Sequence, residues 1–400
     1  MIVGGGIEAV AGINVAREMG LRVVVLDKNP SAPGRAHADD FIQASVYDED
    51  EAERETLKFA KKTPVDGVMA IAVDAAVTVA RLASVLGLPG ISEETALLAT
   101  NKLLMKQCFL EKGVPIPWFS PVSDLDHLKG IIRNFLFPLV LKPVDSRGSR
   151  GVLRLGDAVD LKWAYEYSLS FSKCGQVMVE EWIDGAQVST ESIIYDNESV
   201  LCGTGDRNYD RLDELFPFVV EDGGGCPSYL SPQMDPEFDK VIFQAARSIG
   251  LRRGSIKGDL VVGTNGVTII EVAARLSGGY FCTHTIPLVY GVNLVGAVMQ
   301  IALGERPDIE SLREANVRQY QANRFLFLPE GIVSSVRNVE KVLAYPWVKQ
   351  LELYIREGDP VAKATDHTRR AGTVLTVGDS GELAHRRAEL AISEIEVVVE

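Results

Sequence analysis

The chain lacks long apolar runs and has few cysteines. No stretch of its 400 residues approaches the roughly 18 consecutive apolar residues that a membrane span needs, and the N-terminus begins with a strand pattern rather than a cationic and then apolar signal. The five cysteines lie far apart and form no CxxC pair, which argues against a zinc site and against a disulfide framework. We therefore expect a cytoplasmic protein with no membrane partner.

The chain also lacks an excess of positive charge and the common hydrolase motifs. Its 41 Lys and Arg against 55 Asp and Glu give a formal net charge of -14, which repels nucleic acid and anionic lipid. It contains no GxSxG, HExxH or P-loop motif, and its five histidines do not cluster. We expect no nucleic-acid partner, and any phosphate must be bound by other means.

The N-terminal quarter of the chain has an α/β pattern. Residues 1–98 alternate short apolar runs, such as RVVVLD (22–27), with helical patterns, which indicates a parallel sheet covered by helices. Three glycines, Gly4 to Gly6, follow the first strand without the GxGxxG spacing, and Glu8 would repel a pyrophosphate at the helix N-terminus. An NAD(P)-dependent oxidoreductase is therefore kept only as an alternative.

The rest of the chain has an α+β pattern. Strands are expected at FPLVLKP (137–143) and QVMVEEWI (176–183) within residues 99–322. Residues 323–400 are typical of a small β-rich unit closed by a helix over 382–395. Since single domains typically have about 100 to 200 residues, we expect two or three domains that meet around a cleft.

Two lysines are placed to bind phosphate. Lys102 begins a helix after Thr100, a candidate N-cap, and Lys142 ends an apolar strand directly before the loop PVDSRGSRG. A cation that ends a buried strand needs a partner, which an anion supplies. The backbone N–H groups of a loop that contains Gly148 and Gly151 can surround phosphate oxygens. Taken singly, each lysine is more typical of a solvated surface charge.

Two carboxylates lie on a predicted hairpin. The strands 254–262 and 267–275 are separated by GTNG, which is typical of a tight turn, so Asp259 and Glu271 can lie side by side. Such a pair repels itself without a cation, and Mg²⁺ is usually held by one or two carboxylates and substrate phosphates. The hairpin therefore predicts a magnesium site, with Arg275 on the face of Glu271 by the period of two.

Taken in order, these segments resemble the ATP-grasp superfamily over nearly the whole chain. NKLLMKQCFLEKGVPIP and PLVLKPVDSRGSRGV are similar to the segments that carry two ATP lysines and a flexible phosphate loop. VEEWIDG looks like the adenine hinge, and DLVVGTNGVTIIEVAAR resembles the metal-binding hairpin. The N-terminal stretch VVVLDKNPSAPGRAHADDFI resembles the domain that precedes the ATP-grasp fold in biotin carboxylase, carbamoyl-phosphate synthetase large subunits and the carboxylating ATPase of purine synthesis. The C-terminal part resembles the biotin carboxylase branch, whose layout L-amino-acid ligases share.

The resemblance implies three domains. They are a Rossmann-like domain over 1–98, an ATP-grasp domain over 99–322 with a lid within about 112–183, and a biotin-carboxylase-like β-rich domain over 323–400. Related enzymes are often dimers, so a homodimer is a possible assembly.

The resemblance also implies which residues bind ATP. Lys102 and Lys142 would contact the phosphates, and Gln187 stands where the family usually has the Glu that binds the ribose hydroxyls. An amide can still accept those hydrogen bonds, so nucleotide binding is expected to persist with altered strength. The remaining ATP contacts are expected from the loop and the hinge: Ser146, Arg147, Gly148, Ser149, Gly151, Glu180, Glu181, Trp182 and Ile183.

Metal and substrate residues are implied in the same way. Asp259 and Glu271 would hold Mg²⁺ or Mn²⁺, but Ala273 replaces the usual Asn two residues after the Glu, which removes one oxygen ligand and puts a second ion in doubt. Lys142 and Arg275 would be catalytic, with Arg275 meeting the acyl phosphate or the substrate carboxylate. Further substrate contacts are expected from Ser277, Gly278, Gly279 and His284, and the insert 206–232 is a candidate wall of the acceptor pocket.

The function implied by the resemblance is an ATP-dependent ligase. It would activate a small carboxylate as an acyl phosphate and transfer it to an amine, with release of ADP and phosphate. The sequence RLSGG (275–279) differs from the one that biotin carboxylase uses around bicarbonate, which disfavours a carboxyphosphate-forming enzyme but keeps it as an alternative. A non-catalytic nucleotide-binding protein, suggested by Gln187 and Ala273, is the alternative of another class beside the oxidoreductase.

Overall fold

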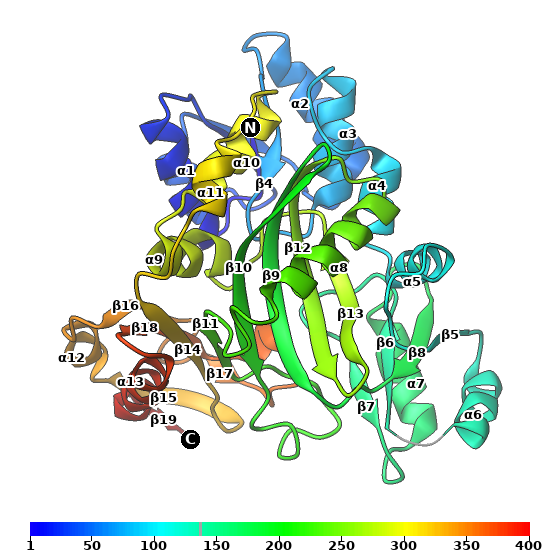
Figure 1. The fold of residues 1–400 in the computed structure, drawn as a ribbon. Helices are drawn as coiled ribbons and strands as arrows, with labels where there is room; N and C mark the ends of the chain where they lie inside the picture. Colours follow the sequence, from blue (N-terminus) through cyan, green and yellow to red (C-terminus); the bar gives the residue numbers. More distant parts are fainter. Residues whose placement is uncertain (136–137) are drawn as a thin grey trace.

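The computed structural model describes residues 1–135 and 138–400, and its first part is an α/β unit (Figure 1). Four parallel strands in the order β3-β2-β1-β4 form its sheet, and their Val, Ile, Leu and Met side chains are mostly buried, as in parallel sheets between helices. The elements are β1 (Ile2–Val3), α1 (Ile7–Glu18), β2 (Val24–Asp27), the 3-10 helix η1 (Pro33–His37), β3 (Asp40–Gln43), α2 (Glu49–Ala60), β4 (Met69–Ala70), α3 (Ala76–Val85) and α4 (Glu93–Leu98).

A second sheet of four antiparallel strands has the order β5-β8-β6-β7. We call this sheet and its two helices the lid. Its predicted strand over 137–143 is found from Leu139 to Pro143, and Phe137 lies outside the described residues. The elements are β5 (Phe119–Val122), α6 (Leu125–Asn134), β6 (Leu139–Pro143), β7 (Leu153–Leu155), α7 (Leu161–Ser170) and β8 (Val177–Glu181).

The centre of the molecule is an antiparallel sheet in the order β13-β12-β9-β10-β11-β14-β18-β16. Its strands are β9 (Ala186–Tyr195), β10 (Glu198–Asn208), β11 (Gly223–Cys226), β12 (Arg253–Gly263), β13 (Gly266–Ala273), β14 (Tyr320–Leu326), β16 (Val348–Leu353) and β18 (Gly372–Gly378). The last three come from the C-terminal part of the chain, which therefore extends the central sheet. The helices of this region are α5 (Lys102–Glu111), α8 (Asp235–Ser248), the π-helix η2 (Phe281–Thr285), α9 (Ile286–Tyr290), α10 (Leu294–Ala302) and α11 (Ile309–Arg313).

The C-terminal part adds a three-stranded sheet and a covering helix. The sheet has the order β17-β15-β19, and α13 packs its buried alanines, Ala384, Ala388 and Ala391, against β14 and β18. The elements are β15 (Gly331–Arg337), α12 (Val339–Leu343), β17 (Pro360–Val361), the 3-10 helix η3 (His367–Arg369), α13 (Gly381–Glu394) and β19 (Glu396–Val399). The predicted closing helix is thus confirmed.

One hydrophobic core joins the first part to the central sheet. Ile13 and Val25 of the first part pack in the same cluster as Ile193 of β9, Leu276 and Val295 of α10. Burial of these side chains on both sides makes the two parts one folding unit at this junction. No helix among the described residues is both long enough and apolar enough to cross a bilayer.

The predicted hairpin is confirmed as β12 and β13. Gly263 pairs with Gly266 across the two-residue turn, and Asp259 lies directly opposite Glu271. Directly opposite residues in an antiparallel pair have their Cβ atoms about 4.5 to 5.5 Å apart. The hairpin therefore brings the two carboxylates side by side, as the sequence indicates.

The N-cap expected at Thr100 is wrong by one residue. The cap of α5 is Asn101, whose side-chain oxygen accepts from the N–H groups of Leu103 and Leu104, at 3.1 Å each. Thr100 instead donates to the carbonyl oxygen of Ala96 in the preceding helix, at 2.8 Å. The short Asn side chain reaches the free N–H groups of the first turn, so Lys102 still begins the helix.

We predict that Gly185→Ala destabilises the protein. A Cβ at Gly185 would lie 2.3 Å from the carbonyl oxygen of Val262, which belongs to the backbone of β12 and cannot move aside. Such overpacking typically costs about 1 to 3 kcal/mol of unfolding free energy. Thermal unfolding should show a lower midpoint for this variant than for Gly6→Ala, where a Cβ would meet nothing within 4 Å. Equal midpoints for the two variants would contradict the packing of the hinge against β12.

Candidate active site

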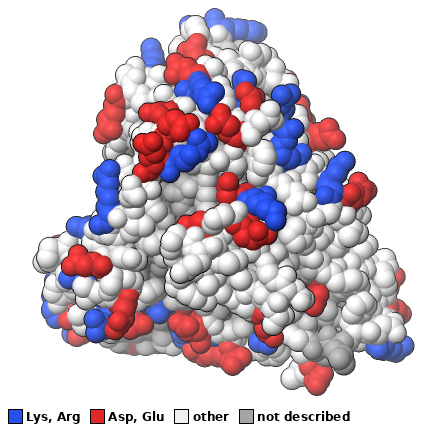
Figure 2. All heavy atoms as spheres, viewed as in Figure 1, with Lys and Arg blue, Asp and Glu red and all other residues white. Residues whose placement is uncertain are grey.

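A cleft lies where the first part, the lid and the central sheet meet. Its volume is about 690 Å³, which is within the usual range for small-molecule sites. Residues of the first part, the lid and the central sheet line it together with His367 and Arg370 of the C-terminal part. On the face in Figure 2 acidic and basic side chains are interspersed, so the net negative charge forms no single patch there. Side chains from the first part, the lid, the central sheet and the C-terminal part therefore all contribute to the cleft.

Two buried lysines share one glutamate at the wall of the cleft. Lys142 of β6 and Glu180 of the neighbouring β8 form an ion pair, and Lys106 of α5 lies 3.4 Å from the other oxygen of Glu180. All three side chains are at most 4% exposed. Lys106 also donates to the carbonyl oxygen of Ile269, at 3.0 Å. This lysine–glutamate cluster, Lys106, Lys142 and Glu180, has two cations for one carboxylate.

The protonation states of the cluster favour binding of an anion. Burial lowers the pKa of Lys106 to about 8, although Glu180 opposes the shift. Burial alone would raise the pKa of Glu180, but Lys106 and Lys142 hold it below its usual range. An anion in the cleft would neutralise the excess positive charge, which is costly to bury alone. Sequence reasoning missed Lys106, although its spacing of four from Lys102 on one helix face was an available signal.

Lys102 connects the hairpin to the predicted phosphate loop. Its ammonium lies 3.1 Å from a carboxylate oxygen of Glu271 and donates to the carbonyl oxygen of Ser146 at 2.7 Å. Burial alone would raise the pKa of Glu271, but Lys102 and then Lys257 and Lys142 outweigh it, so this pKa lies far below its usual range. Glu271 is therefore ionised near neutral pH.

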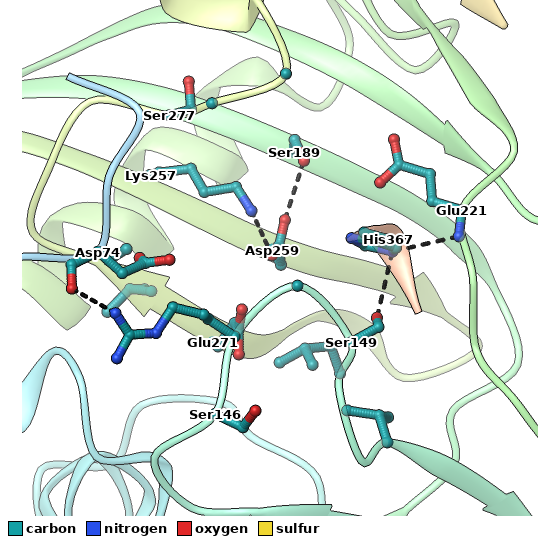
Figure 3. Close-up of a pocket in the computed structure, with 18 of the residues that line it drawn as sticks. Asp74, Ser146, Ser149, Ser189, Glu221, Lys257, Asp259, Glu271, Ser277 and His367 are labelled. Carbon is teal, nitrogen blue, oxygen red and sulfur yellow. Dashed lines mark hydrogen bonds and ion pairs between the residues drawn. The ribbon is translucent and has the colours of Figure 1, made fainter. Parts of the chain in front are cut away.

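The phosphate loop, residues 145–151, contacts the C-terminal part. Gly148 and Ser149 have positive φ angles of 63° and 58°, which turn the backbone toward the cleft. The backbone N–H of His367 donates to the carbonyl oxygen of Gly148 at 3.1 Å, and its ring lies 3.3 Å from the Ser149 hydroxyl (Figure 3). Gly151 is not among the residues that line the cleft, and a Cβ there would lie 2.7 Å from Pro143.

The loop also contacts the first part through Arg147. Its guanidinium donates to the carbonyl oxygen of Asp74 at 2.8 Å and lies 4.4 Å from the centre of the Tyr47 ring. The cleft side of the loop is formed by Ser146, Arg147, Gly148 and Ser149. One short loop is therefore held by residues of two other parts of the fold.

The predicted adenine hinge lies at the edge of the cleft. Glu181, Trp182 and Ile183 line it, and Gln187 of β9 lies beside them. Glu180 differs from the other four, because its carboxylate is engaged by Lys106 and Lys142. The main chain of the hinge is therefore the better candidate for contacts to a base, and the role predicted for the Glu180 side chain stays a prediction.

The carboxylate of Asp259 is surrounded by donors. One oxygen accepts from Arg207 and from the Ser189 hydroxyl, at 3.0 Å each, and the other lies 2.5 Å from the ammonium of Lys257. Burial alone would raise the pKa of Asp259, but Arg207 and Lys257 hold it below its usual range. Figure 3 shows Asp259 between Ser189 and Lys257, with Glu271 nearer to Asp74. The two hairpin carboxylates thus have different surroundings.

Arg275 and the segment after it form the end of the cleft nearest the first part. The Arg275 guanidinium lies 2.6 Å from a carboxylate oxygen of Asp74, and Ser277 donates from both its backbone N–H and its hydroxyl to Glu191. Burial raises the pKa of Glu191 to about 7, with Ser277 opposing the shift. Ser277 is therefore a support for the loop around Gly278 rather than a free hydroxyl.

Glu8 holds the same segment from the first part. Its carboxylate accepts from the N–H groups of Gly279 and Tyr280, at 3.0 and 2.8 Å. Burial raises the pKa of Glu8 to about 7, although the Gly279 hydrogen bond opposes the shift. An acid at the first turn of α1 thus anchors the loop around Gly278. Sequence reasoning weighed Glu8 only against a pyrophosphate.

His284, a predicted substrate residue, lies outside the lining of the cleft. Its ring is 2.9 Å from the hydroxyl of Thr283 and packs edge-on against Tyr280, with 5.1 Å between ring centres. Its neighbours Phe281 and Thr285 line the cleft instead. The helical turn of η2 directs His284 away from the residues with which the sequence grouped it.

The C-terminal part contributes a second arginine. The guanidinium of Arg370 lies 3.5 Å from the centre of the Phe325 ring and donates to the carbonyl oxygens of His367 and Glu221, at 3.0 and 3.4 Å. Arg207, by contrast, pairs with the carboxylate of Glu221 at 3.0 Å. No carboxylate within 4.0 Å of Arg370 is found in the part of the chain that the structure describes. Neither His367 nor Arg370 carried a local sequence signal.

Three protein families match successive parts of the chain. Residues 13–90 match the ATP-grasp N-terminal domain, residues 135–284 the ATP-grasp domain, and residues 324–400 the L-amino acid ligase C-terminal domain 2. A 3-methyl-D-ornithine–L-lysine ligase from Methanosarcina mazei is 22% identical, over 82% of this chain and 80% of that protein. Carnosine synthase 1 from Homo sapiens is 23% identical over 77% of this chain, which spans 40% of that protein.

A solved structure has the same fold over the whole length of this chain. The L-amino acid ligase from Bacillus licheniformis matches with a TM-score of 0.84 and 21% identity, over all of this chain and 98% of that one. At this identity the likeness shows the fold. Two of the matched domains, over residues 13–90 and 135–284, are ATP-grasp domains and the third is a ligase domain, and the chain therefore belongs to the ATP-grasp ligases.

Proposed function

We propose that the protein uses ATP and Mg²⁺ to join a small carboxylate to the amine of an amino acid. The observation that carries this proposal is the lysine–glutamate cluster, which leaves one buried positive charge facing a cleft beside Glu271. The relatives support the choice of substrates, since those named above are an amino-acid ligase, a carnosine synthase and an L-amino acid ligase. ATP phosphates are the anion that the excess charge would bind.

The nucleotide is placed by the hinge and the two lysine-bearing elements. The main chain of Glu181 to Ile183 holds the adenine, Gln187 the ribose, and Lys102 and Lys142 the phosphates. Ser146 to Ser149 then cover the phosphates with their backbone N–H groups. This loop contacts His367 and Asp74. In this closed position it would keep water away from the reacting groups.

The donor set of the hairpin fits a divalent ion at Glu271. This carboxylate is ionised, and its only cation within 4.0 Å among the described residues is Lys102. Mg²⁺ prefers oxygen ligands and commonly takes one or two carboxylates together with substrate phosphates. No three His, Cys, Asp or Glu side chains in the described ranges come together as a metal site. Phosphate oxygens would therefore complete the coordination, and the ion would neutralise their charge.

The residues of the chain position the donor carboxylate for in-line attack. One of its oxygens bonds to the γ-phosphorus as the bond to the leaving ADP oxygen breaks, which gives an acyl phosphate. Arg275 orients the donor from the side of the first part, and Lys142 binds the transferred phosphoryl group. The acceptor amine then attacks the acyl carbon, loses a proton, and phosphate leaves with the electron pair of the broken carbon–oxygen bond.

Arg370 is the residue that we assign to the acceptor. Arg207 and Arg275 each have a carboxylate partner, whereas among residues 1–135 and 138–400 Arg370 donates only to main-chain oxygens. Its guanidinium lies over the ring of Phe325 and can offer a fork of N–H groups to a carboxylate. An acceptor amino acid carries such a carboxylate beside its reacting amine. The C-terminal part would thereby select amino acids over simple amines.

We predict that Lys142→Met reduces turnover by about 100-fold or more, because a preorganised cation at the transferred group is lost. ADP and phosphate release should be measured with Mg²⁺ and ATP against pooled amino acids and, separately, against bicarbonate. The control is Lys129→Met on α6, whose lysine is 42% exposed and pairs with Asp126. Turnover with bicarbonate alone would replace the ligase by a carboxyphosphate-forming enzyme, and wild-type protein that binds no ATP would end the proposal.

We predict that Arg370→Met raises the KM for the acceptor amino acid by about 10- to 100-fold, the loss typical of a charge-assisted hydrogen bond. The KM for ATP should not change. An acceptor whose carboxylate is replaced by an amide should be used equally by both proteins. The matched control is Arg369→Met, since Arg369 is the exposed neighbour in the chain. An unchanged acceptor KM in Arg370→Met would remove this residue from the site.

A further inference from the structure

Asp259 and Glu271 lie side by side but differ in their free oxygens. Both oxygens of Asp259 are engaged, one by Arg207 and Ser189 and the other by Lys257. Its side chain is 6% exposed, whereas the side chain of Glu271 is 35% exposed and has only Lys102 within 4.0 Å among the described cations. A divalent ion can therefore use Glu271 directly, but it would have to displace Lys257 or Arg207 to reach Asp259.

The position next to Glu271 on the same face of β13 offers no ligand. Side chains alternate along a strand, so Ala273 faces the same side as Glu271 and has only a methyl group. The residue opposite Ala273 on β12 is Lys257. The ammonium of Lys257 extends along β12 to Asp259, which itself faces Glu271. The hairpin thus has two neighbouring cross-strand pairs, Lys257 with Ala273 and Asp259 with Glu271.

Lys257 has no other carboxylate within 4.0 Å in the described part of the chain. It lies opposite the buried Glu191 on β9, which accepts from Ser277 instead. Asp259 does not need Lys257 for charge balance, since Arg207 already pairs with it at 3.0 Å. The side chain of Lys257 is 19% exposed and lines the cleft beside Glu271. A cation therefore sits beside the place where the proposed nucleotide phosphates meet Glu271.

We propose that this hairpin holds one divalent ion, at Glu271, and that the Lys257 ammonium occupies the place of a second ion. The inference rests on the proposed function, because the phosphates complete the coordination of the single ion. Many phosphoryl-transfer sites clamp the attacking and leaving oxygens between two metal ions. Here a lysine that is part of the chain supplies one of the two cations, and Ala273 leaves room for its aliphatic stem.

The assignment makes Lys257 a residue that binds phosphate together with the ion. A lysine ammonium is a compact charge with three donors, so it can keep Asp259 and still donate to a phosphate oxygen. An ammonium has no lone pair, so it cannot coordinate a second metal ion. The number of bound ions therefore reports directly on what occupies the position beside Asp259.

The test is a count of Mn²⁺ ions by electron paramagnetic resonance, with the full-length protein and saturating ADP. Wild type should bind one Mn²⁺ per chain and show no spin–spin coupling between ions. Replacing both residues, Lys257→Met with Ala273→Asn, should add a second Mn²⁺ and the broadening of a coupled pair. Ala273→Asn alone should still bind one, because the ammonium stays in place. The affinity for ADP in the presence of one Mn²⁺ should fall about 10-fold in Lys257→Met.

Two coupled Mn²⁺ ions in the wild type would overturn the inference, whatever the variants do. One Mn²⁺ in the wild type with unchanged ADP affinity in Lys257→Met would also overturn it, because Lys257 would then be only a partner of Asp259. Absence of any nucleotide-dependent Mn²⁺ in the wild type would instead count against the proposed function. A double variant that fails to fold leaves the wild-type count and the Lys257→Met affinity to decide.

Discussion

The cleft depends on buried positive charge that the protein's own carboxylates do not fully neutralise. Lys106 and Lys142 approach a single glutamate from a helix and from a strand of the lid, and all three are almost completely buried. Removing such charges from water is costly, and the remaining positive charge makes the empty cleft less stable than one that contains an anion. The same lysines that hold the lid against α5 therefore belong to the proposed phosphate site.

Around this cluster, the fold uses each part for a different contact. The first part supplies Glu8 and Asp74, which hold the loop around Gly278 and Arg275. The central sheet supplies the hairpin with Asp259 and Glu271 at directly opposite positions. The C-terminal part extends the same sheet by three strands, which places Arg370 at the cleft. The site is consequently complete only when all parts are folded together.

Side chains of the same chemical type differ in their charged partners in this cleft. Arg207 pairs with Glu221 and Arg275 pairs with Asp74, while Arg370 has no carboxylate within 4.0 Å among the described residues. In the same way Asp259 is enclosed by donors, and Glu271 is open to the cleft. Partners within a few ångströms therefore distinguish charged side chains of the same type, because an engaged oxygen or N–H must be shared or released before it binds a ligand.

Sequence alone determined the features that depend on neighbouring residues. The apolar runs, the GTNG turn and the glycines of the phosphate loop predicted the strands, the hairpin and the loop, since these follow from side-chain alternation and backbone freedom. Of the predicted site residues, Ser146 to Ser149, the hinge residues and the hairpin acids line one cavity, whereas Gly151 does not. Only the N-cap of α5 was displaced by one residue, because both Thr100 and Asn101 have a suitable oxygen.

Tertiary structure decided the features that depend on residues far apart in the chain. Lys106 and Glu180 are 74 positions apart in the sequence, and His367 and Ser149, which are in contact, are 218 positions apart. Such pairs leave no periodic signal in the sequence, because they arise from the packing of whole sheets. The same packing engaged Glu180 and Asp259 with cations, turned His284 away from the cleft and brought Arg370 to it. The sequence therefore determined which charged groups are present, and only the folded structure decided which of them lie at the cleft and which are paired with each other.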